Sequence, residues 1–367
     1  MSEKSDKMTR RQALGVVGGL VAGGVVGAAG GYYAGMTSAP PAPSGPGGVT
    51  TVTQTILGTT TAMGAGQFKG LTVAWIGGGA GDPYDTLLMD GAADAQKYLG
   101  VRVDYAHTDW DPAKMVQEFS AAIGRHPDGI VCMGHPGYEG LRDLFQQAIG
   151  QGIRIMIADT DVPRLRQEFP GVGYCGANLY QYGQTMGRSG LEAGKLKAGD
   201  RAAVFSGSWD QPERAVAAQG AYDVLAKAGL IVDKVEHPSS VYDDPSTGVP
   251  YVLGYYNAHR DVKLIVFDGG GTTASTVMYM ETLKLNPGQI TVSGTDITPG
   301  SIDALNKGYL QATLEMMPYL QAYQTVLSLC FGKKYGFPGY VLDTTGAAVT
   351  LANLSLFTDP SYAGVRY

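Results

Sequence analysis

The chain has 367 residues, and its 27 basic and 33 acidic side chains give a net charge of −6 with neutral histidines. This balance argues against a nucleic-acid-binding protein, which normally carries a basic excess or stripe. Hydrophobic residues make up 44% of the chain, enough for a real core, and the length favours two domains. The three scattered cysteines fit neither a disulfide framework nor a metal site, so we expect small core residues at Cys132, Cys175 and Cys330.

The first 36 residues are predicted to be an export signal or a membrane anchor. Basic residues up to Arg11 precede a run from Gln12 to Phe68 without a charged side chain. Its apolar part, about 13–36, is long enough to span a bilayer with the N-terminus inside. The sequence TRRQAL at 9–14 resembles a twin-arginine export signal. Glycines recur every four residues from Gly15 to Gly35, a spacing that suits close packing of membrane helices, so both a cleaved signal and a retained anchor stay open.

Residues 37–67 are rich first in proline, glycine and serine and then in threonine. This composition predicts a disordered stalk rather than a packed element. A stalk between an anchor and a folded body implies an extracytoplasmic location, at the outer face of the cytoplasmic membrane.

From residue 71 onward, short apolar runs alternate with segments of helical periodicity. Strands are predicted at 71–76, 101–105, 129–133 and 153–158, and helices at 84–99, 112–124 and 137–149. After a break near 171–178, strands follow at 202–205, 231–236, 264–267 and 290–293, and helices at 180–196, 212–228, 248–258 and 272–285. Near-continuous apolar strands are typical of parallel sheets covered on both faces. The sequence therefore predicts an α/β protein with two doubly wound parallel-sheet units in series.

Polar side chains follow most of these strands, and open α/β sheets bind ligands beyond the carboxyl ends of their strands. A carboxylate accepts hydrogen bonds from neighbouring hydroxyls, and an aromatic face covers the C–H patches of a sugar ring. For any single aspartate, capping of the next helix is the alternative role. As a set they predict a site for a neutral polyol, made of Asp82, Tyr84, Asp85, Asp159, Thr160, Asn178, Trp209, Gln211, Glu213, Arg214, Tyr242, Asp268 and Asp296.

Motifs for catalysis, cofactors or metals are weaker. Asp82 with Asp85, and Asp159 with Asp161, are candidate carboxylate pairs for glycoside hydrolysis or metal binding. The GGGTTA run at 269–274 imitates a dinucleotide fingerprint but lacks the acidic residue expected about 20 residues later, so a tight turn is predicted. We expect no enzyme activity, cofactor or metal. Surface or turn positions are expected for the histidines, at positions 107, 126, 135, 237 and 259.

The body resembles the periplasmic sugar-binding proteins of ABC transporters, in the branch that binds ribose, galactose and similar sugars. The resemblance covers about 69–350 and is most specific at 294–313, GTDITPGSIDALNKGYLQAT, and at 318–323, PYLQAY. It implies two lobes that close on the ligand by a hinge, joined by three crossovers near Gly176, Met317 and Asp343. The lobes would comprise 68–176 with 318–343, and 177–317 with 344–367.

The resemblance also implies site residues. Three family positions are occupied differently here. The usual arginine falls on Ala217, and Arg214 can substitute from one turn earlier. An amide or acidic position falls near Gly269, and a glutamine position near Met316–Met317. The other contacts of the family fall on Asp82–Tyr84, Asp159, Gln211–Arg214, Tyr242 and Asp296, with Asn178 at a crossover.

The leading hypothesis is a surface-anchored sugar receptor of an ABC importer. Its partners would be a monosaccharide or similar polyol, the permease with its ATPase, and the membrane through the N-terminal helix, but no nucleic acid, with a monomeric body. The alternative is a signalling receptor of the same fold for a sugar-like autoinducer, and the remote alternative is a glycosidase. A related transcriptional repressor is disfavoured because an export segment stands in place of a DNA-binding head.

Overall fold

The computed structural model describes residues 66–367. The predicted signal or anchor at 1–36 and nearly all of the predicted stalk at 37–67 lie outside the described residues. None of the helices in residues 66–367 combines the length and the hydropathy that a membrane span requires.

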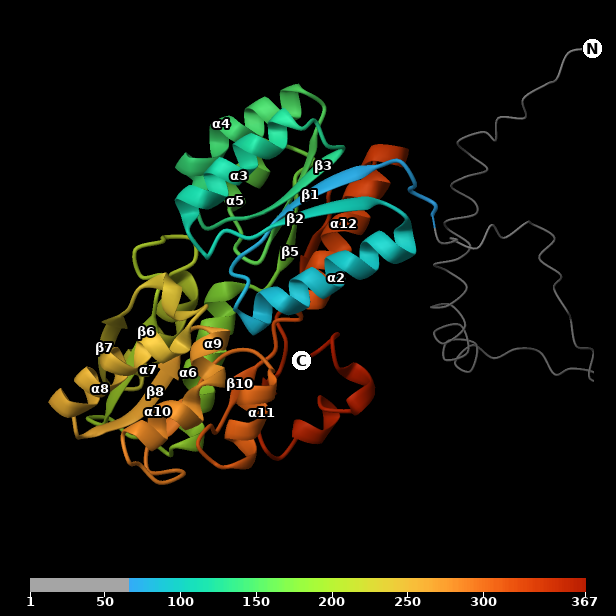
Figure 1. The fold of residues 1–367 in the computed structure, drawn as a ribbon. Coiled ribbons are helices and arrows are strands. Elements are labelled where there is room, and N and C mark those ends of the chain that lie inside the picture. Colours follow the sequence, from blue (N-terminus) through green and yellow to red (C-terminus); the bar gives the residue numbers. More distant parts are fainter. Residues whose placement is uncertain (1–65) are drawn as a thin grey trace, which may run out of the picture. The chain divides into compact units, whose positions relative to one another are not determined.

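The first sheet contains six parallel strands in the order β11-β5-β4-β3-β1-β2. On one face α2 (Pro83–Leu99) packs against α12 (Pro318–Tyr335), and α3 (Pro112–Gly124), α4 (Gly137–Gly150) and the short α5 (Pro163–Glu168) cover the other (Figure 1). The strands are β1 (Thr72–Ile76), β2 (Arg102–Ala106), β3 (Gly129–Met133), β4 (Arg154–Ala158), β5 (Gly173–Gly176) and β11 (Val341–Asp343).

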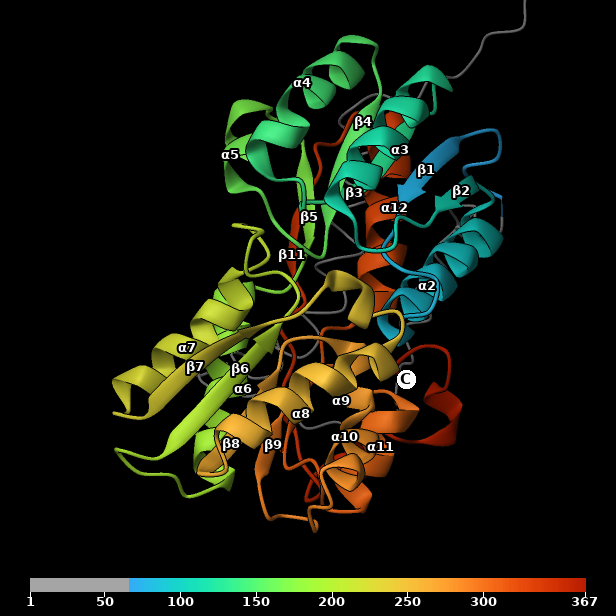
Figure 2. The ribbon, with the colours of Figure 1, turned by 60° about the vertical axis from the view of Figure 1, so that its left-hand side comes forward.

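The second sheet has four parallel strands in the order β7-β6-β8-β9. They are β6 (Arg201–Ser206), β7 (Ile231–Glu236), β8 (Val262–Phe267) and β9 (Thr291–Ser293). One face carries α6 (Leu179–Ala193) and α7 (Val216–Lys227), and the other carries α8 (Val249–Ala258), α9 (Gly270–Ala274), α10 (Thr276–Thr282) and α11 (Pro299–Asn306) (Figure 2). A small antiparallel pair joins β10 (Thr313–Leu314) to β12 (Ala348–Val349).

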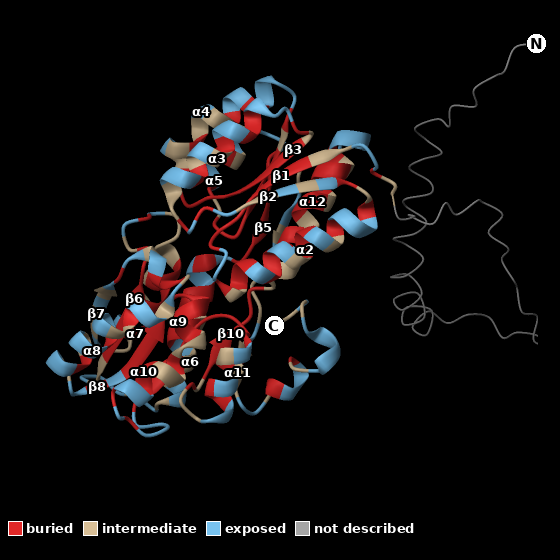
Figure 3. Ribbon diagram, viewed as in Figure 1, coloured by how far each residue is buried: buried red, intermediate tan, exposed pale blue. Residues whose placement is uncertain are grey.

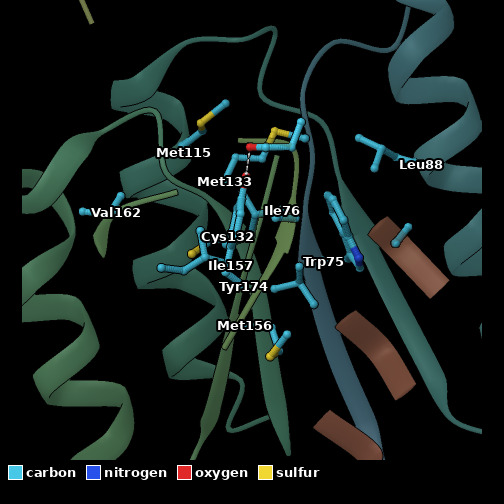
Figure 4. Close-up of a cluster of buried hydrophobic side chains, with 14 of the residues drawn as sticks. Trp75, Ile76, Leu88, Met115, Cys132, Met133, Met156, Ile157, Val162 and Tyr174 are labelled. Atoms are coloured by element: carbon cyan, nitrogen blue, oxygen red, sulfur yellow. Dashed lines mark hydrogen bonds between the residues drawn. The ribbon is translucent and has the colours of Figure 1, made fainter. Parts of the chain in front are cut away.

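Burial on both faces explains the near-continuous apolar strands. Along β6, Ala202 and Val204 pack with the α6 and α7 layer, whereas Ala203 and Phe205 pack with the opposite layer. Figure 3 shows the buried strands beneath helices whose outer surfaces are exposed. In the first sheet, side chains such as Trp75 and Cys132 fill the core (Figure 4). All three cysteines are buried and unbridged, as expected.

The chain passes between the sheets after β5, between β10 and α12, and between β11 and β12. The predicted fold class, two doubly wound parallel-sheet lobes joined by three crossovers, is therefore confirmed. The predicted break at 171–178 is wrong in part, because it contains β5, whose four residues are too short and glycine-rich to stand out. The helix predicted at 272–285 is two short helices, α9 and α10, which meet at Ser275.

The strand order predicts where a ligand-binding crevice opens in each sheet. In the first sheet the chain leaves β1 for β2 on one side and returns to β3 on the other, and β6 has β7 and β8 on opposite sides in the same way. Such reversals open a crevice beyond the carboxyl ends of the strands. The loops after β1, β3, β6 and β8 are therefore the expected walls of a site.

Candidate functional site

A narrow cavity lies between loops of the two lobes. The first lobe contributes loops after β1, β2, β3 and β4, and the second contributes loops after β6, β7, β8 and β9. The lining residues are Asp82, Tyr84, Trp110, His135, Asp159, Arg214, Tyr242, Gly269, Gly270, Thr295, Asp296 and Met316.

Asp159, directly after β4, is the centre of a hydrogen-bond network in the first lobe. Its Oδ1 accepts from the Tyr84 hydroxyl at 2.9 Å, and its Oδ2 lies 3.0 Å from Nε2 of His135 and 2.8 Å from the Thr160 hydroxyl. Burial acts to raise the pKa of Asp159, but these hydrogen bonds and the charges of His135 and Arg214 outweigh it and lower the pKa. Asp159 is therefore an ionised acceptor inside the cavity.

His135, directly after β3, connects Asp159 to the second lobe. Its Nδ1 lies 2.9 Å from Oε1 of Gln211, which lies between β6 and α7. His135 stands in a turn, which was one of the two expected positions, but its side chain is buried in the site rather than exposed. His237 is buried as well. The position of His135 at a strand end was the signal that could have identified it.

Arg214 is the positively charged group of the second lobe in the cavity. Its guanidinium donates to both carboxylate oxygens of Asp268, at 3.0 and 3.1 Å, and Asp268 also accepts from the Ser206 hydroxyl at 3.0 Å. Burial acts to lower the pKa of Arg214, but the charge of Asp268 raises it above its ordinary value. Asp268 therefore holds a charged donor in place rather than facing the cavity itself.

Two further carboxyl groups, Asp82 and Asp296, have few partners. Asp82 caps α2 by accepting from the Tyr84 amide at 2.8 Å, and Asp296 accepts from the Thr295 hydroxyl at 3.2 Å. Burial raises the pKa of Asp82 well above its ordinary value, and the charge of Asp296 adds to this effect. Burial raises the pKa of Asp296 to about 7 despite the Thr295 hydrogen bond, which lowers it. Both groups can change protonation when a ligand enters.

The glycines at 269–271 provide room for the second lobe's side chains. A Cβ at Gly269 would lie 2.2 Å from the Tyr242 ring, and one at Gly270 would lie 2.4 Å from Oδ2 of Asp296. The Tyr242 hydroxyl in turn accepts from the Gly207 amide at 2.7 Å. The run that imitates a dinucleotide fingerprint thus opens the short helix α9 and allows close packing around the cavity.

Comparison with known proteins identifies the family. Residues 73–330 match the periplasmic binding protein domain. The chain belongs to this family. It is 29% identical over 230 residues to the xylose/arabinose-binding protein XylF of Sulfolobus acidocaldarius, which covers 60% of this chain and 55% of that protein. The chain thus matches about half the length of this curated relative.

Solved structures share the fold. An ABC transporter solute-binding protein from Burkholderia graminis, in complex with D-arabinose, aligns with a TM-score of 0.68 at 23% identity, over 79% of this chain and 99% of that one. A carbohydrate transporter from Acidothermus cellulolyticus, in complex with myo-inositol, aligns with a TM-score of 0.69 at 18% identity, over 81% and 99%. The resemblance to periplasmic sugar-binding proteins of ABC transporters is confirmed.

Six of the thirteen predicted site residues line the cavity of this periplasmic binding protein: Asp82, Tyr84, Asp159, Arg214, Tyr242 and Asp296. Three others form hydrogen bonds or an ion pair with residues that line the cavity. Thr160 forms a hydrogen bond with Asp159, and Gln211 forms one with His135. Asp268 forms an ion pair with Arg214. None of the three is among the lining residues, and their direct contact with a ligand stays a prediction.

The remaining four predicted residues lie away from the cavity. The Asp85 carboxylate is occupied by the Gly78 amide, the Tyr105 hydroxyl and His107, all within 2.8 Å. Asn178 caps α6. Lys234 lies over the Trp209 ring, and Glu213 accepts from the Tyr138 amide at 3.3 Å. Local partners thus account for Asp85, Asn178 and Glu213, whereas Nε1 of Trp209 is buried without a hydrogen-bond partner among the described residues.

Sequence reasoning missed Trp110, His135, Thr295 and Met316 as lining residues. Trp110 and His135 follow strands β2 and β3, where the strand-end rule points, and Trp110 also carries an aromatic ring of the kind expected at a sugar site. Met316 stands near the family's glutamine position and makes that part of the wall apolar. Within residues 66–367, no group of three His, Cys, Asp or Glu side chains is arranged to hold a metal ion.

Proposed function

We propose that this protein binds a neutral monosaccharide or similar polyol in the cavity between its lobes. The observation that carries the proposal is the ionised Asp159, held by His135 and Tyr84, in a buried cavity with two further carboxyl groups and one arginine. Carboxylates accept from sugar hydroxyls, and the arginine donates to a sugar oxygen. Xylose, arabinose and myo-inositol, named for the relatives, share adjacent hydroxyls and no charge.

The binding residues follow from these positions. Asp82, Asp159 and Asp296 would accept from ligand hydroxyls, and Arg214 would donate. The rings of Tyr84, Trp110 and Tyr242 would cover the apolar faces of the ligand. Because the carboxylates come from both lobes, the ligand itself would hold the lobes together.

The wider role is that of an extracytoplasmic receptor for an ABC importer. The lobes, at 68–176 with 318–343 and at 177–317 with 344–367, would close around the sugar. The closed form would deliver it to the permease and its ATPase. The first 36 residues would supply export, by a twin-arginine route, and anchoring.

A binding function fits the carboxyl groups better than glycoside hydrolysis. Asp85 is fully occupied, and Asp161 forms two hydrogen bonds with Arg166, at 2.8 and 2.6 Å. These partners leave neither candidate carboxylate pair free for the acid and base roles of a glycosidase.

Thermal unfolding of the protein with D-xylose, D-arabinose, D-ribose, D-galactose and myo-inositol tests the proposal. A ligand at about 1,000 times its Kd should stabilise the folded state by about 4 kcal/mol. Asp159→Ala and Asp296→Ala should lose the ligand-dependent shift, and Asp161→Ala, outside the cavity, should keep it. No shift with any sugar, or equal shifts in all variants, would contradict the proposal.

A further inference from the structure

Trp110 stands in a backbone conformation that a bulky residue rarely adopts. It lies in the loop between β2 and α3, and both Asp109 and Trp110 have left-handed backbones, with φ of 52° and 56°. This region is unfavourable for residues with large side chains, and such strain concentrates at functional sites. The loop is therefore held against its local preference.

The loop after β1 supplies the contacts that hold it. The amides of Thr108 and Asp109 donate to the Gly78 carbonyl at 2.7 and 3.2 Å, and the Thr108 hydroxyl donates to the Gly77 carbonyl at 2.7 Å. A Cβ at Gly78 would lie 2.4 to 2.5 Å from three ring atoms of Trp110. Only glycine at position 78 lets the indole occupy this place.

The indole is part of an aromatic wall on the first lobe's side of the cavity. Its ring centroid lies 6.1 Å from that of Tyr84 and 5.5 Å from that of His135, and both pairs are tilted. All three residues line the cavity. Trp110 thus stands beside the two residues that hold Asp159.

The indole N–H of Trp110 is uncommitted. Its Nε1 is buried and has no hydrogen-bond partner among the described residues, which is also true of Trp75 and Trp209, but of these three side chains Trp110 is the one that lines the cavity. A buried Trp N–H usually finds a partner, since an unpaired buried donor is costly. The other potential donors of this wall are occupied: the Tyr84 hydroxyl lies 2.9 Å from both Asp159 and Gln321, and both His135 nitrogens face acceptors.

A sugar hydroxyl needs both kinds of partner. It gives its proton to a carboxylate and still carries lone pairs that accept from a donor. On the first lobe's side, Asp82 and Asp159 supply acceptors. Among the side chains that line the cavity from that lobe, Trp110 supplies the free donor.

We propose that Trp110 selects the ligand, by donating its indole N–H to one ligand oxygen while its ring covers the adjacent C–H face. The inference rests on the proposed function, that the cavity holds a neutral sugar. The preferred ligand would therefore have an oxygen atom and an apolar face on the side that points toward Tyr84 and His135. A deoxy sugar that lacks this oxygen would bind more weakly.

The test is calorimetric titration of the full chain with D-xylose, D-arabinose and their monodeoxy analogues. Trp110→Phe keeps a ring and removes the N–H, so affinity should fall roughly tenfold, the worth of about one hydrogen bond. One monodeoxy analogue should bind wild-type protein more weakly than its parent sugar, and Trp110→Phe should bind the two equally.

Trp75→Phe is the matched control, because Trp75 is also buried with an unpartnered Nε1 but stacks on Tyr105 in the core, outside the cavity. It should keep the wild-type affinity and the ligand-induced change in fluorescence, which Trp110→Phe should lose. This fluorescence test holds even where a variant is less stable. Wild-type affinity and fluorescence response in Trp110→Phe, or equal losses in both variants, would overturn the inference alone. Wild-type protein that binds no sugar would overturn the proposed function and this inference with it.

Discussion

Nδ1 of His135 lies 2.9 Å from Oε1 of Gln211, and the two residues belong to different lobes. The other ring nitrogen of His135 lies 3.0 Å from Asp159. One side chain therefore both orders the main acceptor of the cavity and connects the lobes that must close around a ligand. Ligand affinity and lobe closure should depend on the same histidine.

Replacing His135 by glutamine should weaken sugar binding. Glutamine has no ring with two separate nitrogens, so it cannot contact Asp159 and Gln211 at the same time as His135 does. Affinity should fall roughly tenfold to a hundredfold, the range for hydrogen bonds to charged groups. His107→Gln is the matched control, because His107 also bonds a buried aspartate, Asp85, but outside the cavity. Equal affinities of the two variants, measured by calorimetry, would contradict the role of His135.

Sugar affinity should fall in acid because of Asp296. Burial holds its pKa at about 7, and ligand hydroxyls that donate to the carboxylate would favour the ionised form and lower the pKa. At a pH between the pKa of the free protein and the lower pKa of the complex, binding releases a proton. Affinity therefore falls by up to about tenfold per pH unit below neutrality and does not change with pH above it.

Calorimetric titrations at several pH values between about pH 5.5 and about pH 8 measure how affinity changes with pH. This pH range spans the pKa of Asp296. Asp296→Asn should bind more weakly and show a smaller slope, with the remainder due to Asp82, whose pKa is also raised. Affinity that rises on acidification would show that the ligand prefers the protonated carboxyl.

The buried pair of Arg214 and Asp268 should matter for folding as well as binding. Arg214→Met leaves the carboxylate of Asp268 buried without its cation, which typically costs about 3–5 kcal/mol. The free energy of unfolding, measured with denaturant, should fall accordingly. Lys307→Met, which removes an exposed ion pair with Asp303, should leave it unchanged. A similar small effect of both changes would mean that Arg214 is not held as the structure shows.

Gly79 should limit how far the lobes approach each other. A Cβ at this position would lie 1.5 Å from Oδ1 of Asp243, which belongs to the other lobe. Gly79→Ala therefore overpacks the closed form, at about 1–3 kcal/mol, or roughly fivefold to a hundredfold in affinity. Gly254→Ala, on α8 with open space around it, should leave affinity unchanged and stabilise the helix. Unchanged affinity of Gly79→Ala would argue against lobe contact at this point in the bound form.

The fold could be predicted because its signals are local. Apolar strands such as 129–133 and helices such as 112–124 carry their period in the sequence, and their alternation specifies parallel sheets. The strand β5 and the helix break at Ser275 were not predicted, because the conformation of short glycine- and threonine-rich segments depends on tertiary packing and leaves no periodic pattern in the sequence.

The site was predicted in part, for a related reason. Aspartates at strand ends can be recognised in the sequence, and Asp82, Asp159 and Asp296 do line the cavity. Whether a side chain faces the cavity or a neighbour depends on contacts between distant segments. The carboxylate of Asp85 forms hydrogen bonds with Tyr105 and His107. Trp110 reaches the cavity only through a left-handed backbone conformation, which the sequence does not show.

The most direct test of the account is calorimetric titration of wild-type and Asp159→Asn protein with D-xylose, D-arabinose and myo-inositol. The asparagine keeps the shape of the side chain and removes the charge that the network around Asp159 sustains. The account predicts saturable binding of at least one of these neutral polyols by the wild type and its loss in the variant. Equal affinity in both proteins, or no binding of any neutral sugar by the wild type, would contradict it.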